Sequence, residues 1–349
     1  GGGSATEQSM VWRALLFVAC VGGQECYVFD TKHKSAGMTV FLALQSVARG
    51  CVDKCDVYEF DWASQTCKLE NFHRNRERCG GGKQDECPCL SKNVTRPRVL
   101  FSSSVSAYAG DPSWARPRCR WFTLIRDPIA RLGSALYYCR STPTDPLCGD
   151  RRLPFATWTM RDMADHWGNL LFRETLFFRD LAVLAATNAA YADEGTCSPW
   201  PAAESGNRSG TSLIPWFVWR HALRRMGCGD EPERPAGRAN LEVVVSHIEA
   251  GRLYDAVGIV EHFDEATSLF DCRVPLWWTT TAWGPLLARH TQSHHSARWK
   301  DDERRAVDHA RTDPYVRDKL QADIRIYDAA VRVFRRSFAP GGTPTNCVV

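Results

Sequence analysis

Residues 26–48 read CYVFDTKHKSAGMTVFLALQSVA, and this stretch decides the fold class. Residues 26–30 combine aromatic and β-branched side chains, which predicts a short buried strand. A polar turn that contains a glycine follows over residues 31–37. Residues 39–48 then place Val40, Leu44 and Val47 on one face of a helix. The stretch therefore predicts a strand, a turn and a helix in succession.

Similar units recur along the chain. Short apolar runs predict further buried strands at residues 99–101, 121–125, 241–245 and 256–260. Helical spacing predicts helices over residues 128–138, 163–186, from Asp264 onward and over 313–338. Because strands alternate with helices, we expect an α/β fold with a parallel sheet flanked by helices.

The turn after the first strand has the residues of a phosphate-binding site. Backbone N–H groups at a helix N-terminus attract anions, Lys34 adds a full charge, and Ser35 and Thr39 add hydroxyl donors. Gly37 allows the backbone to approach an anion closely. The order differs from that of a Walker A motif, so an ordinary P-loop ATPase is not expected. The alternative is a surface turn that contains a lysine.

A second segment, residues 122–135, has the same character. A predicted strand ends at Arg126, and Asp127 and Pro128 lead into a helix that carries Ser134. Arginine can hold a phosphate through two hydrogen bonds, and Ser134 can donate a third. The alternative is that Arg126 pairs with Asp127 or with another acidic residue.

Together the two segments resemble the cofactor-binding motifs of sulfotransferases that use 3′-phosphoadenosine 5′-phosphosulfate (PAPS). The likeness is to the Golgi carbohydrate sulfotransferases of the 2-O and 6-O uronyl, heparan and chondroitin type. The residues that match the 5′-phosphosulfate motif are Lys34, Ser35, Ala36, Gly37, Met38 and Thr39. Met38 departs from the usual hydroxyl residue. The residues that match the motif for the 3′-phosphate are Ile125, Arg126, Asp127, Pro128, Arg131 and Ser134, and of these Arg126 and Ser134 would bind the phosphate.

Three further segments resemble this family, in the same order along the chain. Asn169 and Arg173 match an Asn-x-x-x-Arg region, residues 257–264 match a strand-to-helix element, and residues 318–338 match the closing helix. The resemblance implies the sulfotransferase fold, a P-loop-like parallel sheet with disulfide-stapled insertions. Length and composition predict one domain over residues 24–340, with a disulfide-stapled, cysteine-rich insertion at about 50–97, an exposed loop at about 192–212 and a tail at 341–349.

The activity that the resemblance implies is direct in-line transfer of a sulfuryl group from PAPS to a hydroxyl of a glycan or a related polyhydroxylated acceptor. Lys34 would neutralise the leaving oxygen, and no metal is required because lysine, arginine and helix termini supply positive charge. Relatives carry a histidine after the second strand, where this chain has serines at residues 102–104. We therefore consider Glu59 and His73 as candidates for the general base. The alternatives are a P-loop-type nucleotide kinase, or an inactive disulfide-rich binding protein on the same fold.

Cysteine content indicates the compartment. The chain has 15 cysteines, and Asn93 and Asn207 lie in glycosylation sequons. A zinc site is the weaker interpretation of the cysteines, since their spacing lacks paired CxxC motifs. Disulfides and sequons favour the secretory pathway, and the resemblance specifies the Golgi lumen. We interpret residues 1–23 as a tag, a signal or a stem, with any membrane anchor outside this chain. The net charge of +4 suits an anionic ligand and is too small to indicate nucleic acid.

The stretch 273–300 is rich in tryptophan and histidine and shows no clear periodicity. Trp277, Trp278 and Trp283 could stack on sugar rings, but core packing is the favoured interpretation. His294 and His295 could lie over the cofactor, although we expect them on the surface.

Overall fold

The computed structural model describes residues 26–32, 35–50, 56–61, 66–69, 98–102, 119–143, 148, 154–176, 232–233, 235–276, 282–289 and 297–347. At its centre is a six-stranded sheet with the strand order β3-β2-β4-β1-β5-β6. Every neighbouring pair is parallel except β2 and β3. The strands are β1 (Cys26–Thr31), β2 (Asp56–Asp61), β3 (Thr66–Leu69), β4 (Arg98–Ser102), β5 (Arg120–Ile125) and β6 (Ala256–Ile259). The predicted α/β class is confirmed.

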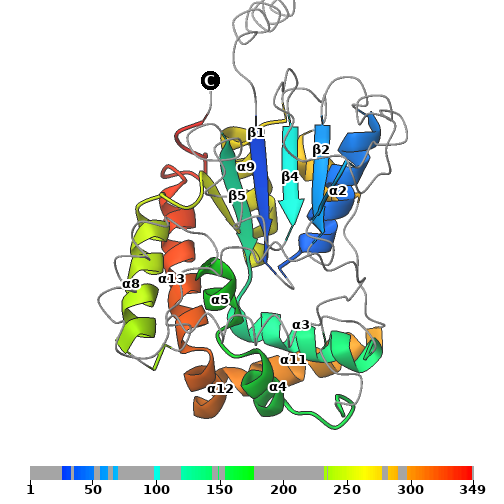
Figure 1. The fold of residues 1–349 in the computed structure, drawn as a ribbon, viewed down its shortest axis with the longest axis vertical. Helices are drawn as coiled ribbons and strands as arrows, with labels where there is room; N and C mark the ends of the chain where they lie inside the picture. Colours follow the sequence, from blue (N-terminus) through cyan, green and yellow to red (C-terminus); the bar gives the residue numbers. More distant parts are fainter. Residues whose placement is uncertain are drawn as a thin grey trace, which may run out of the picture.

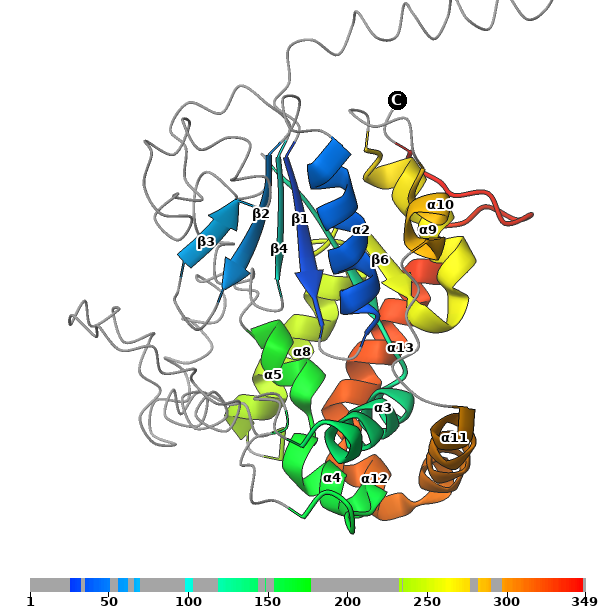
Figure 2. The ribbon, with the colours of Figure 1, turned by 90° about the vertical axis from the view of Figure 1, so that its right-hand side faces the viewer.

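Helices surround this sheet (Figures 1 and 2). The helices are α2 (Gly37–Gly50), α3 (Pro128–Ser141), α4 (Met160–Trp167), α5 (Leu170–Leu176), α8 (Pro235–Glu249), α9 (Phe263–Arg273), α10 (Trp283–Ala288), α11 (Ala297–Thr312), α12 (Pro314–Lys319) and α13 (Gln321–Arg336), with a 3₁₀ turn η7 (Val260–His262). In Figure 2, α2, α9 and α10 lie on one side of the sheet. Helix α13 packs on β6, and α8 packs on α13. Helices α3, α4, α11 and α12 form a layer below the arrowheads of the strands in Figure 1.

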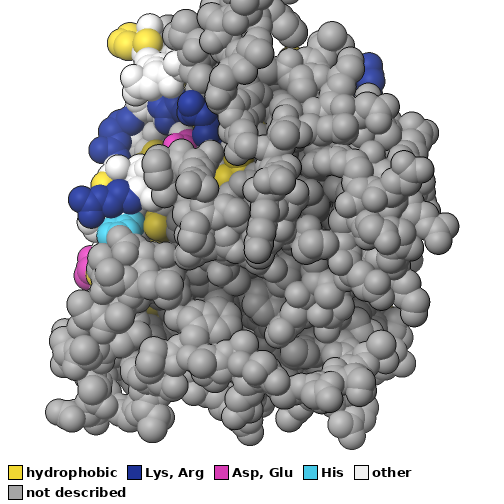
Figure 3. Space-filling view, turned by 45° about the horizontal axis from the view of Figure 1, so that its top comes forward, with side chains coloured by type: hydrophobic (Ala, Val, Ile, Leu, Met, Phe, Trp, Pro, Cys, Tyr) yellow, Lys and Arg dark blue, Asp and Glu magenta, His cyan; other side chains and the backbone are white. Residues whose placement is uncertain are grey.

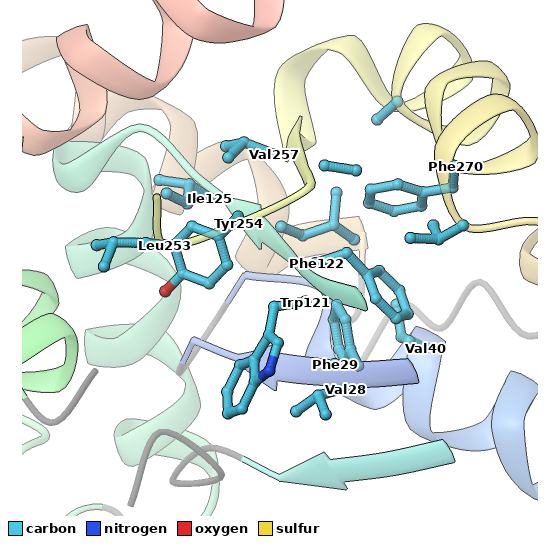
Figure 4. Close-up of a cluster of buried hydrophobic side chains, with 14 of the residues drawn as sticks. Val28, Phe29, Val40, Trp121, Phe122, Ile125, Leu253, Tyr254, Val257 and Phe270 are labelled. Carbon is cyan, nitrogen blue, oxygen red and sulfur yellow. The ribbon is translucent and has the colours of Figure 1, made fainter. Parts of the chain in front are cut away.

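The core forms around the neighbouring strands β1 and β5. The residues of β1 and β5 are almost all buried, as expected for parallel strands that are covered on both faces. The ring of Phe122 lies 5.0 Å from that of Phe29 and 5.2 Å from that of Phe270 (Figure 4). It also lies 5.4 Å from the ring of Trp283. Trp283 is fully buried, so core packing is confirmed for it. Trp277, Trp278, His294 and His295 lie outside the described residues.

The strand predicted at residues 241–245 is wrong, because these residues lie inside helix α8. Three consecutive valines favour a strand by propensity, but the buried side chains Leu241, Val244 and Ile248 recur at helical spacing. In Figure 3 the described surface with its Lys and Arg side chains lies at the left, where Figure 1 places α8 and α13. Two arginines of α13 form ion pairs there with acids of α8, Arg325 with Glu242 and Arg332 with Glu249. These pairs join the two helices.

Residues 50–97 are more than an insertion. Strand β2 lies inside the sheet between β3 and β4. In the backbone register of the parallel pair β2 and β4, Asp56 lies opposite Arg98. The strand was not predicted because three of its six residues are acids and because it lies in a polar, cysteine-rich region.

Two long predicted helices are each interrupted. The helix predicted over residues 163–186 divides into α4 and α5 at Gly168 and Asn169, whose φ is 55°. At Gly168 a Cβ atom would lie 2.8 Å from the carbonyl oxygen of Lys319, so only glycine fits against the end of α12. The helix predicted over 313–338 divides into α12 and α13 at Leu320.

Three disulfides join described cysteines: Cys26–Cys119, Cys139–Cys148 and Cys272–Cys347. Such bonds are typical of a protein made in an oxidising, secretory-type environment. The disulfides predicted within the cysteine-rich insertion at about 50–97 concern side chains outside the described part of the chain. Among the described helices, none has both the length and the apolar character that a membrane span needs.

Close packing of α3 on α11 depends on Gly133. A Cβ atom at this position would overlap the Cγ2 atom of Val307. We expect Gly133→Ala to lower the free energy of unfolding by about 1–3 kcal/mol, the usual cost of overpacking. Urea denaturation measures the loss. The double variant Gly133→Ala/Val307→Ala should recover part of it, because the truncated Val307 makes room, and a purely additive double variant would contradict this explanation.

Candidate anion-binding site

The two predicted phosphate motifs lie at one edge of the sheet. Strands β1 and β5 are parallel neighbours, with Thr31 paired with Leu124. The turn at residues 35–37 follows β1, and Arg126 follows β5, so both lie at the carboxyl ends of adjacent strands. After β1 the chain continues to β2 on one side of the sheet, whereas after β5 it continues to β6 on the other. Such a switch in strand order is where α/β proteins bind ligands.

Among the described side chains, none caps the start of helix α2. The first helical hydrogen bond runs from the N–H of Val40 to the carbonyl oxygen of Ala36, which leaves the N–H groups of residues 37–39 without helical acceptors. Ala36, at the capping position, has no side-chain acceptor to offer and has a φ of 57°. A left-handed alanine costs free energy, and turns of this kind form anion-binding concavities. The uncapped start of α2 is therefore suited to an anion.

Ser35 adds a buried hydroxyl to this turn. Its side chain is 1% exposed, and its Oγ atom has no hydrogen-bond partner among the described residues. Its N–H donates to the carbonyl oxygen of Lys32 at 3.1 Å, which closes the turn. At Gly37 a Cβ atom would overlap the Thr31 side chain, so glycine is needed for the turn to lie against the end of β1. A buried hydroxyl without a partner is costly, and a bound anion would satisfy it.

The turn after β5 is built differently. The Oδ1 atom of Asp127 accepts from the N–H of Ala130 at 2.7 Å and caps α3, and Pro128 occupies the first helical turn. The Oε1 atom of Glu261 accepts from the N–H of Asp127 at 3.0 Å. The Tyr327 hydroxyl donates to the other Glu261 oxygen at 3.2 Å. Burial, with the nearby Glu261 charge, raises the pKa of Tyr327, so the phenol keeps its proton. Glu261 and Tyr327, which the resemblance matched, thus hold this turn in place.

Arg126 projects from this turn and is partly exposed. Its side chain is 25% exposed, and its Nη2 atom lies 3.7 Å from a carboxylate oxygen of Glu303 on α11. The acidic partner that we considered is therefore Glu303, whereas Asp127 serves as the cap. At 3.7 Å this pair is longer than a charge-assisted hydrogen bond of about 2.7–2.9 Å. Ser134 is half-buried on α3, two turns further along.

Two buried charged residues that were not predicted from the sequence lie at the end of β1 and directly after it, next to the first turn. Asp30 and Lys32 are almost fully buried and form an ion pair at 2.7 Å. The Tyr254 hydroxyl, which points away from the ring cluster in Figure 4, donates to Asp30 at 2.6 Å. Burial raises the pKa of Asp30, while Lys32 and Tyr254 act in the opposite direction. Burial and the Asp30 charge raise the pKa of Tyr254 well above its ordinary value.

A second buried cluster lies between α3, α5 and α13. Arg131 is 2% exposed and pairs with Glu174 at 3.4 Å and with Asp323 at 3.7 Å. Asp323 also accepts from the N–H groups of Leu171 and Phe172, at 3.0 and 2.8 Å. Burial raises the pKa of Asp323, against the effect of Arg131 and these two donors. Arg131 matches the family motif, but its guanidinium forms ion pairs inside the protein, with Glu174 and Asp323.

Asn169, another residue matched by the resemblance, has a structural role. Its side-chain oxygen accepts from the N–H of Ala322 at 3.0 Å and caps the start of α13. The contacts of Asn169 and Asp323 could have been predicted from one signal in the sequence. A charged or amide residue stands at a position that is otherwise apolar, as Asp323 does between Ala322 and Ile326.

Several predicted site residues lie outside the described part of the chain. Lys34 and His73 are among them, and Met38 is described only as part of the backbone of α2. Glu59 lies in β2, paired with Phe101, and its side chain is outside the described atoms. Its strand is two positions from β1, which is about 10 Å at the usual strand spacing. The general base therefore stays a prediction.

No protein-family model matches this chain, and no curated protein matches it.

Proposed function

We propose that this protein is a PAPS-dependent sulfotransferase of the secretory pathway, in the Golgi lumen, that acts on a hydroxyl of a glycan or a related polyhydroxylated acceptor. One observation carries the proposal. Within the described part of the chain, the start of α2 has no side-chain cap and the buried Ser35 hydroxyl has no hydrogen-bond partner. Both lie at the carboxyl end of β1, and Arg126 lies at the carboxyl end of the adjacent β5. Two anion-binding groups on neighbouring strands suit a nucleotide that carries phosphate at two positions.

The strand order supports a P-loop-like sulfotransferase fold. The parallel strands run in the order β2-β4-β1-β5-β6, so the first strand of the chain is central and carries the phosphate-binding turn. The second motif then begins on the next strand in the sheet. The resemblance implies a parallel sheet with a phosphate-binding turn after its first strand, and this strand order is compatible with it.

The residues of the first turn fit the 5′-phosphosulfate. PAPS, when bound, supplies the activated sulfuryl group. The N–H groups of residues 37–39 and the Ser35 hydroxyl would hold its oxygens, with Thr39 beside them. Lys34 would neutralise the charge that grows on the leaving oxygen.

The residues of the second turn fit the 3′-phosphate. The partly exposed guanidinium of Arg126 would exchange its long contact with Glu303 for the phosphate, and Ser134 would add a hydroxyl donor. Glu59 or His73 would take the proton of the acceptor hydroxyl. No metal enters this scheme, because the chain supplies the positive charge.

The direct test is transfer of labelled sulfate from PAPS to a panel of glycans and small polyhydroxylated alcohols by the purified protein. Transfer to at least one acceptor supports the proposal. Phosphate transfer from ATP, or no transfer to any acceptor together with no binding of PAPS, would reject it.

Thermal stability in the presence of nucleotides gives a second prediction. The PAPS product 3′-phosphoadenosine 5′-phosphate (PAP) should stabilise the folded protein by about 2.7 kcal/mol at 100 times its Kd. ATP should stabilise it less, because it lacks the 3′-phosphate that Arg126 and Ser134 would bind. Differential scanning fluorimetry measures both shifts in Tm.

Two arginine variants provide the control for this measurement. Arg126→Ala should reduce the advantage of PAP over ATP. Arg161→Ala, which removes a surface arginine paired with Asp313, should preserve it. Equal shifts from PAP and ATP in the unaltered protein would argue against a sulfotransferase.

A further inference from the structure

A continuous series of buried charges connects the two proposed phosphate-binding turns. We call Asp30, Lys32, Glu174, Arg131 and Asp323 the buried ion-pair chain. Lys32 Nζ lies 2.7 Å from Asp30 and donates to the backbone oxygen of Glu174 at 3.4 Å. The Glu174 carboxylate lies 3.4 Å from Arg131, whose other nitrogen lies 3.7 Å from Asp323. Each of these five side chains is at most 3% exposed.

Two members of the buried ion-pair chain, Lys32 and Arg131, each belong to one of the two turns. Lys32 is part of the first turn, because its carbonyl oxygen accepts from the N–H of Ser35. Arg131 lies in the first turn of α3, and its N–H donates to the carbonyl oxygen of Asp127, next to Arg126. Glu174 on α5 contacts both, through its backbone oxygen on one side and its carboxylate on the other. Asp323 fixes the start of α5 through the N–H groups of Leu171 and Phe172.

Stability alone does not explain such an arrangement. Buried ion pairs contribute little net stability compared with well-packed apolar residues of similar volume. Their demanding geometry does restrict the elements that carry them. Here those elements are the end of β1 and the start of α3, which carry the two phosphate motifs.

We propose that Glu174 is a positioning residue that holds the two phosphate-binding turns at the spacing required by one nucleotide with both a 5′- and a 3′-phosphate. The proposal deepens the proposed function and rests on it. When both turns are held in place beforehand, the second phosphate binds without a further ordering cost, so a doubly phosphorylated nucleotide gains affinity. A nucleotide with one phosphate uses one turn and gains nothing from their spacing.

The test compares three nucleotides: PAP, adenosine 5′-phosphate and adenosine 3′-phosphate. Isothermal titration calorimetry measures the Kd of each with the unaltered protein and with Glu174→Gln, which removes the charge but keeps the backbone oxygen that Lys32 contacts. We expect the variant to bind PAP roughly 10- to 100-fold more weakly, a typical size for coupling between sites. Its affinity for the two monophosphates should be unchanged. Glu242→Gln, which breaks an exposed ion pair on α8, should leave all three affinities unchanged.

Hydrogen exchange of the ligand-free proteins gives a second measurement. Glu174→Gln should speed amide exchange at residues 35–40 and 126–131 together, and Glu242→Gln should not. If Glu174→Gln does not fold, Arg131→Lys replaces it in both measurements, because it keeps the charge but loses the planar fork that meets two acids.

The outcomes separate the two proposals. Unchanged PAP affinity in the variant, or equal weakening of all three nucleotides, would overturn the positioning role while leaving the proposed function intact. An unaltered protein that binds no PAP would overturn the proposed function. In that case faster exchange at both turns would still support the role of Glu174 in holding them, and unchanged exchange would overturn it.

Discussion

Replacing Lys34 by alanine is expected to lower the turnover of sulfuryl transfer by roughly 100- to 1000-fold, the usual loss for one donor that stabilises a developing oxyanion. The charge on the leaving oxygen is largest in the transition state, so most of the loss should appear in kcat. Steady-state kinetics with PAPS as the varied substrate measure it.

Arg126→Ala is the matched variant for this measurement. The 3′-phosphate is remote from sulfur and its charge does not change during transfer, so its contacts bind the ground state and the transition state alike. We expect mainly a higher KM for PAPS, with a smaller fall in kcat. Near-normal turnover in Lys34→Ala, with turnover abolished in Arg126→Ala at saturating PAPS, would show that the two roles are assigned wrongly.

Replacing Asp323 by alanine is expected to lower the free energy of unfolding by about 3–5 kcal/mol, as is typical when one partner of a buried ion pair is removed. The variant leaves the N–H groups of Leu171 and Phe172 without their acceptor and leaves the buried Arg131 with Glu174 alone. Urea denaturation measures the loss.

Asp328→Ala is the control on the same helix. Asp328 is exposed, so its replacement should change the free energy of unfolding by no more than about 0.5 kcal/mol. Equal effects from the two variants would mean that the contacts of Asp323 do not matter for stability.

Much of the sheet could be predicted from local sequence. Strands β1, β4, β5 and β6 are short apolar runs, and a strand buried on both faces needs little more to be recognised. Strand β2 and helix α8 could not be predicted in this way. Three of the six residues of β2 are acids, so the strand does not show as an apolar run. The valines of α8 favour a strand by propensity, and packing on α13 stabilises the helix instead.

The candidate site was predictable where its residues are neighbours in sequence. The turns at Ser35 and Arg126 each form from a few consecutive residues. The buried ion-pair chain was not predictable, because its contacts join distant residues: Arg131 and Glu174 are 43 positions apart, and Asp323 and Leu171 are 152 apart. Only the folded sheet and its helices bring these side chains together.

The disulfide between Cys26 and Cys119 has a consequence for biosynthesis. It joins the amino ends of the neighbouring strands β1 and β5, and its two cysteines are 93 positions apart in the chain. During translation Cys26 therefore cannot form its native disulfide until Cys119 has been synthesised. Six other cysteines are synthesised before Cys119: Cys51, Cys55, Cys67, Cys79, Cys87 and Cys89. Strand β1 also remains without its neighbours in the sheet at this stage, because β4 and β5 are both synthesised much later. Correct pairing thus depends on thiol–disulfide exchange and on protection of an apolar strand, so we expect maturation to rely on the isomerases and chaperones of the compartment where the chain is made.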